Sequence, residues 1–271
     1  MVMRRCLIAA SKNHVRYRQK NDCKQIMKKH PKLLLRESCI GDLSAKWVPG
    51  RFVEMGAGTG YMTRLFLERG FTGACHDLGD DSREIMRRSL ADAGGRIRVV
   101  DDLGELEPAS FDYLFAFEVL EHIENDLDVL RDWMRYLKPG GRILVSVPAH
   151  QRKSGRSDEI VGHVRRYEKR DLCDLLDQAG CGDIHIVNYG FPITEATRRL
   201  SNWMIRNDRS YEGMTPEQRS IRSAQAKPKV INRMLAPVGD SLFTPFCTIQ
   251  RWFYGRDWGD GYVANGVKRG I

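Results

Sequence analysis

The sequence RFVEMGAGTGY at residues 51–61 decides the fold. Its first half is an apolar run that predicts a strand, and the spacing of apolar residues after it predicts a helix. The glycines Gly56, Gly58 and Gly60 therefore lie where a strand meets a helix N-terminus. At such a point the backbone can approach a ligand closely, and the exposed N–H groups and the helix dipole favour an anionic or polar one.

The glycine spacing argues against a dinucleotide site. The dinucleotide fingerprint needs a small residue at the sixth position, and counting from Gly56 that position holds Tyr61. A tyrosine is too large for the close packing of helix on strand that the fingerprint requires. A pyrophosphate-binding dehydrogenase is therefore disfavoured, and a tight turn without any ligand stays open as the alternative.

Apolar runs and helical patterns alternate on both sides of this loop. Further strands are expected at residues 72–76, 97–100, 111–119, 142–148 and 183–189. Helices are expected at residues 61–69, 125–137 and 169–179, and a further helix is expected to begin at an N-cap at Ser82. The Lys-Pro-Gly-Gly sequence at residues 138–141 is expected to end the helix at 125–137. A long polar loop is expected at residues 150–167. Nearly continuous apolar strands that alternate with helices predict a doubly wound α/β domain, in which a parallel sheet is covered on both faces.

Acidic residues follow successive strands at the edge where such sheets bind ligands. Asp77 follows the second strand, where a carboxylate can accept hydrogen bonds from two ribose hydroxyls. Asp101 and Asp102 follow the third strand and can face a base edge, with Leu103 packed against the ring, and Glu118 follows the fourth. Any one of these could be a solvated loop acid, but the whole set favours a ligand site.

Taken together, these motifs resemble the class I S-adenosylmethionine-dependent methyltransferases over residues 50–190. The matching set is Glu54-x-Gly56-x-Gly58-x-Gly60, Asp77, Asp102-Leu103, FDY at residues 111–113, EVLEHI at residues 118–123 and LKPGG at residues 137–141. The resemblance implies a Rossmann-like seven-stranded sheet of order 3-2-1-4-5-7-6 with helices on both faces. Residues 262–268 are suited to be the antiparallel seventh strand.

The resemblance also implies roles for these residues. S-adenosylmethionine is the expected cofactor and S-adenosylhomocysteine the expected product, with no metal. The glycine loop holds the methionine end of the cofactor, and Glu54 and Glu118 are further cofactor-binding candidates. Asp77 binds the ribose, and Asp102 with Leu103 meets the adenine.

A second resemblance concerns the acceptor. The runs VPAH at residues 147–150, DE at residues 158–159 and GHVRRY at residues 162–167 are similar to a bacterial branch of small-molecule methyltransferases from polysaccharide and natural-product clusters. This implies a small, natural-product-like or saccharide-like acceptor that is methylated on oxygen or nitrogen. An RNA methyltransferase, a methyltransferase for a lipid-linked acceptor and a non-catalytic module that binds S-adenosylmethionine remain alternatives.

Two histidines are candidates for a general base. Methyl transfer from a sulfonium depends mainly on orientation, but a hydroxyl acceptor must also lose its proton. Histidine is the usual base near neutral pH, so His122 and His163 are the catalytic candidates. His122 can instead pack beside the cofactor.

Four residues of the polar loop are candidates for acceptor binding. They are His150, Arg165, Arg166 and Tyr167. A guanidinium forks onto planar anions, so the two arginines can clamp a carboxylate or a phosphate of the acceptor. A solvated pair of surface arginines is the alternative for them.

The charge is distributed unevenly along the chain, with a basic segment at each end and an acidic segment between them. The 271 residues carry a net charge of +9, but residues 1–36 have eleven Lys and Arg against one acid, whereas residues 37–197 have twenty against twenty-eight. Residues 198–271 have thirteen against six. We expect a basic N-terminal helical arm at residues 1–48, a cofactor-binding α/β core at residues 49–190, a helical cap at residues 191–258 and the final strand of the core at residues 259–271.

The basic ends allow three interpretations. They can hold a small anionic acceptor, bind RNA, or contact an anionic membrane. The aromatic residues of the cap, among them Trp203, Trp252 and Trp258, are expected to form its core or the walls of a pocket. The seven cysteines form no C-x-x-C pair, and no apolar segment of signal-peptide or membrane-spanning length is present, so a cytoplasmic protein is expected. The oligomeric state stays open.

Overall fold

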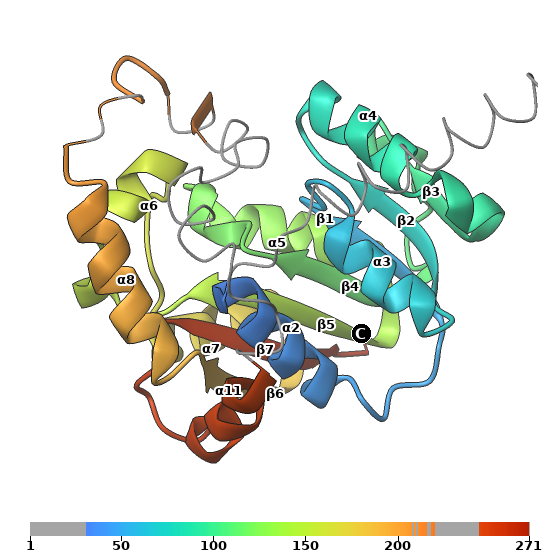
Figure 1. Cartoon of the computed structure of the whole chain (residues 1–271). Coiled ribbons are helices and arrows are strands. Elements are labelled where there is room, and N and C mark those ends of the chain that lie inside the picture. Colours follow the sequence, from blue (N-terminus) through green and yellow to red (C-terminus); the bar gives the residue numbers. More distant parts are fainter. Residues whose placement is uncertain (1–30, 208, 210, 216–217, 220–243, 271) are drawn as a thin grey trace, which may run out of the picture.

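One mixed sheet organises the chain, and its strands follow the order β3-β2-β1-β4-β5-β7-β6 (Figure 1). The structure is a computed structural model that describes residues 31–207, 209, 211–215, 218–219 and 244–270. The strands are β1 (Arg51–Met55), β2 (Thr72–His76), β3 (Ile97–Val99), β4 (Phe111–Phe117), β5 (Leu137–Pro148), β6 (Cys181–Tyr189) and β7 (Gly261–Lys268). Strand β7 runs antiparallel to both β5 and β6, while the other pairs are parallel. The predicted fold and strand order are confirmed.

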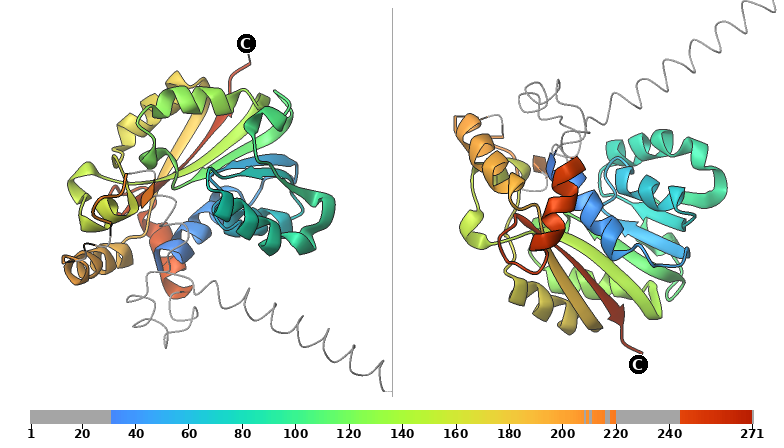
Figure 2. Two further views of the ribbon diagram at one scale, coloured as in Figure 1. Left: turned by 90° about the horizontal axis from the view of Figure 1, so that it is seen from above. Right: turned by 60° about the horizontal axis from the view of Figure 1, so that its bottom comes forward.

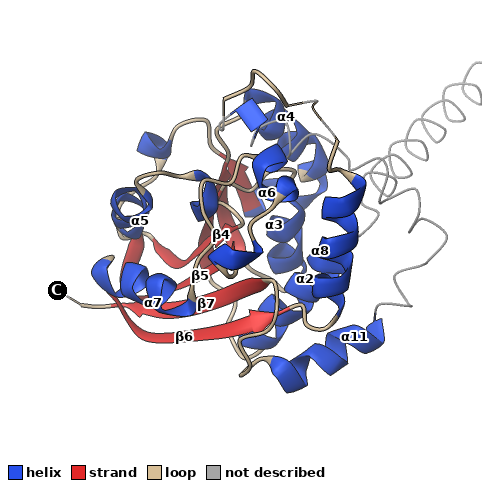
Figure 3. Ribbon diagram, turned by 90° about the vertical axis from the view of Figure 1, so that its left-hand side faces the viewer, coloured by secondary structure: helices blue, strands red, loops and turns tan. Residues whose placement is uncertain are grey.

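Helices cover both faces of this sheet (Figures 2 and 3). Buried side chains of α5 and α7 pack against one face, and those of α2, α3 and α4 against the other. The helices are α2 (Pro31–Leu43), α3 (Tyr61–Glu68), α4 (Asp80–Ser89), α5 (Asp126–Met134), α6 (Arg156–Val161), α7 (Lys169–Gln178), α8 (Ile193–Met204) and α11 (Thr244–Ile249). Short 3₁₀ turns are η1 (Ala91–Arg96), η2 (Leu103–Glu105), η3 (Leu120–His122), η4 (Gln151–Lys153) and η6 (Gln250–Phe253).

An aromatic stack fixes the helix that follows the glycine loop. Phe66 of α3 lies with its ring centroid 4.1 Å from that of Phe115 in β4, and Phe52 of β1 stacks on Phe115 at 5.2 Å. All three side chains are fully buried. Stacked aromatic pairs add about 0.5–1.5 kcal/mol to the free energy gained by burying their area. The N-terminus of α3 is therefore held at the carboxyl end of β1.

The parallel register brings the strand ends together. Met55 of β1 pairs with His76 of β2 and with Ala116 of β4. The residues that follow these strands therefore share one edge of the sheet, which we call the carboxyl edge. The glycine loop, Asp77 and Glu118 all follow directly from it.

Some local predictions are wrong. Ser82 is not an N-cap: Gly79 holds that position, and Ser82 is buried inside α4. The helix expected at residues 125–137 ends at Met134, and buried Leu137 pairs with Phe111, so that the Lys-Pro-Gly-Gly segment belongs to β5. The loop expected at residues 150–167 contains η4 and α6.

Both basic ends are only partly described. Residues 1–30 of the arm lie outside the described residues, and α2 packs into the core through Leu35, Cys39 and Ile40. The described part of the cap includes α8, α11 and η6, whereas residues 220–243 lie outside the described residues. The proposed domain boundaries stay a prediction. Among the described helices, none is both long and apolar enough to cross a membrane.

Candidate functional site

The three glycines of the loop have different surroundings. All have positive φ: 66° for Gly56, 56° for Gly58 and 77° for Gly60. A Cβ on Gly56 would lie 2.5 Å from Cγ2 of Val119, and one on Gly60 would lie 3.0 Å from Cδ1 of Leu90. A Cβ on Gly58 would meet no atom within 4 Å. A side chain at Gly56 or Gly60 would therefore crowd its neighbours, whereas Gly58 faces open space.

Asp77 joins the first two strand ends. Its carboxylate accepts hydrogen bonds from the backbone N–H of Gly58 at 2.9 Å and of Gly79 at 3.1 Å. The next residue, Leu78, leaves 82% of its side chain exposed. An exposed leucine beside Asp77 is an apolar surface on which a planar ring can pack. Leu78 was not predictable as an exposed residue, because a leucine that follows a strand usually belongs to the core.

Glu54 lies beneath the loop. It is buried and accepts a 2.6 Å hydrogen bond from the hydroxyl of Thr63. Burial raises the pKa of Glu54 to about 8, so its carboxyl group is mostly protonated at neutral pH. A neutral, hydrogen-bonded carboxyl group at this position supports the loop from below.

The acids after β3 divide into two kinds. Asp101 forms an ion pair with Arg83 at 2.9 Å, whereas Asp102 caps η2 by accepting the N–H of Gly104 at 2.7 Å. Asp102 is exposed, and Leu103 packs partly against the core. Asp102 is thus the acid of this pair that can reach a ligand.

Glu118 forms the centre of a charged cluster at the carboxyl edge. Lys32 donates to its carboxylate at 2.9 Å, and the guanidinium of Arg36 lies 3.5 Å away. The hydroxyls of Ser146 and Tyr189 each donate to it at 3.4 Å. Burial by itself would raise the pKa of Glu118, but the charges of Lys32 and Arg36 hold it well below its usual range. Glu118 is therefore a carboxylate at neutral pH.

Helix α2 brings both cations of this cluster to the edge. Lys32 and Arg36 are one helical turn apart, so they share a face. The Nε atom of Arg36 is buried and has no hydrogen-bond partner within the described part of the chain. The N-terminal arm was expected to be basic and helical, but Arg36 was not singled out. Its spacing of four from Lys32 is the signal that could have found it.

His163 is held by an aspartate. Its Nδ1 atom lies 2.8 Å from Asp158, and its Nε2 atom lies 3.7 Å from Glu121. Burial alone would raise the pKa of Asp158, but the hydrogen bond from His163 and the charge of Arg166 lower it to about 2. Asp158 is thus a carboxylate that fixes the imidazole and leaves Nε2 facing Glu121.

Glu121 and His122 complete this cluster. Glu121 is fully buried, and neither carboxyl oxygen has a hydrogen-bond partner among the described residues. Burial and the nearby charge of Glu118 raise the pKa of Glu121 to about 7. The Nδ1 atom of His122 lies 3.2 Å from the carbonyl of Gly162, and burial lowers the pKa of His122.

The same cluster has the donors of a metal site. One ligand atom from each of Glu121, His122 and His163 lies within 4.8 Å of the others. The two imidazole rings meet edge to face, with centroids 4.8 Å apart. Imidazole and carboxylate donors suit divalent transition metals.

Arg166 lies inside the protein. It is buried, and its guanidinium pairs with Asp158 at 2.9 Å and with Asp260 at 3.0 Å. It also donates to the carbonyl of Ala149 at 3.1 Å. These contacts hold the polar loop against the start of β7. They also occupy the guanidinium nitrogens of Arg166 that were expected to bind an anion of the acceptor.

The other loop candidates also make internal contacts. Arg165 and the hydroxyl of Tyr167 both donate to Asp126, at 2.8 and 2.7 Å. His150 is buried, with Nδ1 at 3.2 Å from Glu168. These residues fix the course of the loop, whereas His163 lies in the cluster with Glu121.

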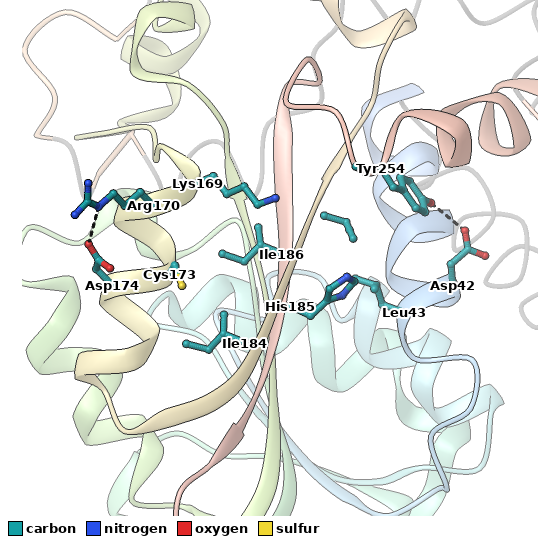
Figure 4. A pocket seen from close by; sticks show the side chains of 12 residues that line it. Asp42, Leu43, Lys169, Arg170, Cys173, Asp174, Ile184, His185, Ile186 and Tyr254 are labelled. Carbon is teal, nitrogen blue, oxygen red and sulfur yellow. Dashed lines mark hydrogen bonds and ion pairs between the residues drawn. The ribbon is translucent and has the colours of Figure 1, made fainter.

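A separate groove lies beside strand β6 (Figure 4). Its volume is about 940 Å³, and its lining includes Ile184, His185 and Ile186 of β6 together with Asp42 and Tyr254. The glycine loop, the acids after the strands and the two histidines are not part of this lining. The candidate functional site is therefore the carboxyl edge, not this groove.

Comparisons with known proteins identify the domain that carries this site. Residues 18–186 match a methyltransferase domain. The ubiquinone biosynthesis O-methyltransferase of Idiomarina loihiensis is 26% identical over 153 residues, which cover 50% of this chain and 63% of that protein. The protein of the same name from Xylella fastidiosa is 30% identical over 112 residues, which cover 39% of this chain and 46% of that protein. The chain thus spans less than two thirds of each of these relatives.

Solved structures are similar in fold. The Haemonchus contortus phosphoethanolamine N-methyltransferase 2 in complex with S-adenosylmethionine has a TM-score of 0.55 at 18% identity, over 87% of this chain and 52% of that one. The YcgJ protein of Bacillus subtilis has a TM-score of 0.55 at 14% identity, over 87% of this chain and 99% of that one. The domain match covers more than half of the residues, so the chain belongs to the methyltransferase domain family, that of the S-adenosylmethionine-dependent methyltransferases.

Proposed function

We propose that this protein transfers the methyl group of S-adenosylmethionine to a hydroxyl oxygen of a small anionic acceptor. One observation carries the proposal: the carboxyl edge combines an open glycine loop and Asp77 with a partly buried pair of cations, Lys32 and Arg36. The glycine loop and Asp77 suit the cofactor, and the two cations suit an anion on the acceptor. The curated relatives, named as O-methyltransferases, favour oxygen over nitrogen.

The cofactor fits the residues on the first three strand ends. Gly58 leaves space where a side chain would block a ligand, and Asp77 lies directly beside it. Asp77 would accept the ribose hydroxyls, and Asp102 would receive the adenine amino group. Leu78 and Leu103 offer apolar surface to the ring. Bound there, the cofactor supplies an activated methyl group on a sulfonium.

His163 would act as the general base. With the cofactor bound, its sulfonium would supply the methyl group to the acceptor oxygen and leave as the thioether, and Nε2 of His163 would take the proton of the acceptor hydroxyl. Asp158 fixes the imidazole through Nδ1 and stabilises the imidazolium that forms. The products are the methyl ether, S-adenosylhomocysteine and a proton. His122, whose ring meets that of His163 edge to face, is the second candidate.

The anion of the acceptor would meet α2. Arg36 has a buried Nε without a hydrogen-bond partner among the described residues, and a carboxylate or phosphate oxygen would supply one. Arg165 and Arg166 are no longer the preferred clamp, because Arg165 has a carboxylate of its own and Arg166 has two. Within the part of the chain that the structure describes, Lys32 and Arg36 share a single carboxylate, that of Glu118, which leaves this pair with an excess positive charge. A carboxylated phenol or a phosphorylated saccharide has the required chemistry.

A labelled-methyl transfer assay tests the proposal. The protein is incubated with S-adenosylmethionine carrying a labelled methyl group and a panel of hydroxylated acceptors, each with and without a carboxylate or phosphate. We expect transfer to anionic members, with an acid-stable ether as product, and a loss of turnover in His163→Ala. Transfer only to uncharged acceptors would overturn the role of α2, and unchanged turnover in both His122→Ala and His163→Ala would overturn the base.

A further inference from the structure

The tryptophans of the cap are exposed. Of the five tryptophans in the chain, Trp203, Trp252 and Trp258 have 61%, 77% and 50% of their surface exposed, whereas Trp133 is buried. They were expected to form the core of the cap or the walls of a pocket, and the expectation of a core is wrong for these three residues. Tryptophan is highly buried on average in folded proteins, and exposed apolar surface in a cluster marks a binding site.

Helix α8 presents one outward face. Its exposed residues recur at intervals of three and four, the spacing of one helix face. They are Ala196, Arg199, Leu200 and Trp203 in the helix, and Arg206 just after it. The opposite face is anchored, because Arg198 lies 3.3 Å from Asp260 and buried Thr194 packs inward. The apolar stripe of Leu200 and Trp203 therefore projects from a fixed helix.

The η6 turn extends this face. Phe191, just before α8, contacts the rings of Phe253 and Trp258, with centroids 4.9 and 5.4 Å away. This aromatic contact joins the start of α8 to the segment that carries Trp252 and Trp258. Figures 1 and 3 show α8 and α11 on the same side of the molecule. We call residues 193–207 together with 251–258 the α8–η6 face.

Arginines accompany the exposed tryptophans. The guanidinium of Arg206 lies 4.7 Å from the ring centroid of Trp203, and that of Arg256 lies 5.7 Å from that of Trp258. The exposed residues of the face include four arginines, Arg199, Arg206, Arg251 and Arg256, and one acidic residue, Asp257. Tryptophan together with arginine is the composition of surfaces that lie at the boundary of lipid headgroups and acyl chains. The positive charge complements anionic headgroups.

We propose that the α8–η6 face docks the protein on an anionic membrane surface. The apolar stripe projects outward from α8 and is not recessed in a groove, so its side chains can insert among lipid headgroups. Because α8 begins where β6 ends, docking places the carboxyl edge next to the bilayer. This inference concerns where the protein works and does not depend on the identity of the acceptor.

Vesicle sedimentation of the full chain tests the docking. Phosphatidylcholine vesicles with and without phosphatidylglycerol are compared, and binding is followed by sedimentation and by the blue shift of tryptophan emission. We expect binding to the anionic vesicles. Replacing Trp203 and Trp252 with Ser should weaken it roughly tenfold per residue, equivalent to about 1.4 kcal/mol each. The control Val48→Ser changes an apolar residue that is 75% exposed and not part of the face, and this variant should bind like the wild type.

Calorimetry with S-adenosylmethionine separates loss of docking from loss of fold, because the Trp→Ser variants should bind the cofactor like the wild type. Failure of the wild type to bind anionic vesicles overturns the proposal. Binding that survives both Trp→Ser substitutions also overturns it, since the basic arm alone would then be the contact. Self-association of the wild type that requires Trp203 would assign the face to a protein partner instead.

Discussion

Glu121→Gln should remove a large pH dependence of stability. Burial and the charge of Glu118 raise the pKa of Glu121 from 4.5 to about 7, so the folded chain keeps a proton that the unfolded chain has lost. Between about pH 4.5 and 7 the unfolded state binds fewer protons, and the free energy of unfolding falls as the pH rises. A shift of this size corresponds to about 3 kcal/mol. Glutamine has the shape of the protonated acid but cannot ionise.

Urea unfolding of the wild type and of Glu121→Gln across this range measures the effect. We expect similar stability near about pH 4.5 and a variant that is more stable by about 3 kcal/mol near about pH 8. The difference between the two proteins cancels the contribution of other titrating groups. Glu124→Gln is the matched control, since Glu124 is exposed nearby and should leave the pH dependence unchanged. An equal free-energy difference at every pH would refute a buried, protonated Glu121.

Further predictions concern the loop and the base. Gly56→Ala should lower the free energy of unfolding by about 2–5 kcal/mol, because positive φ and a Cβ 2.5 Å from Val119 both add cost. Gly58→Ala should cost only about 1–2 kcal/mol in urea unfolding but weaken cofactor binding in calorimetry, and equal stability losses would contradict an open Gly58. Asp158→Asn should lower kcat by roughly a hundredfold without changing cofactor affinity, and His163→Ala combined with it should be no slower than His163→Ala alone. Additive losses would show that Asp158 does not act through His163.

The sheet was predictable because its signals are local. Apolar strands, the glycine loop and the acids after each strand follow one another in the chain, and the parallel topology places them at one edge. Ser82 failed as a cap because burial of the serine within α4 outweighed its preference for a helix end.

The partners of the charged groups were not predictable in the same way. Lys32 lies eighty-six positions from Glu118 in the chain, and Arg166 lies ninety-four positions from Asp260. A basic residue in a polar loop looks the same in sequence whether it faces an acceptor or an internal carboxylate. The packing of α2 on the sheet and the position of β7 within the sheet decide which partner each basic residue meets.

Titration calorimetry with S-adenosylmethionine tests the central claim most directly. The wild type is titrated beside Asp77→Ala, which removes the carboxylate that accepts the N–H of Gly58 at the loop. We predict one binding site with micromolar affinity in the wild type and a large loss of affinity in Asp77→Ala, with both proteins folded by circular dichroism. No binding by the folded wild type at micromolar concentrations, or equal binding by both proteins, would contradict the account.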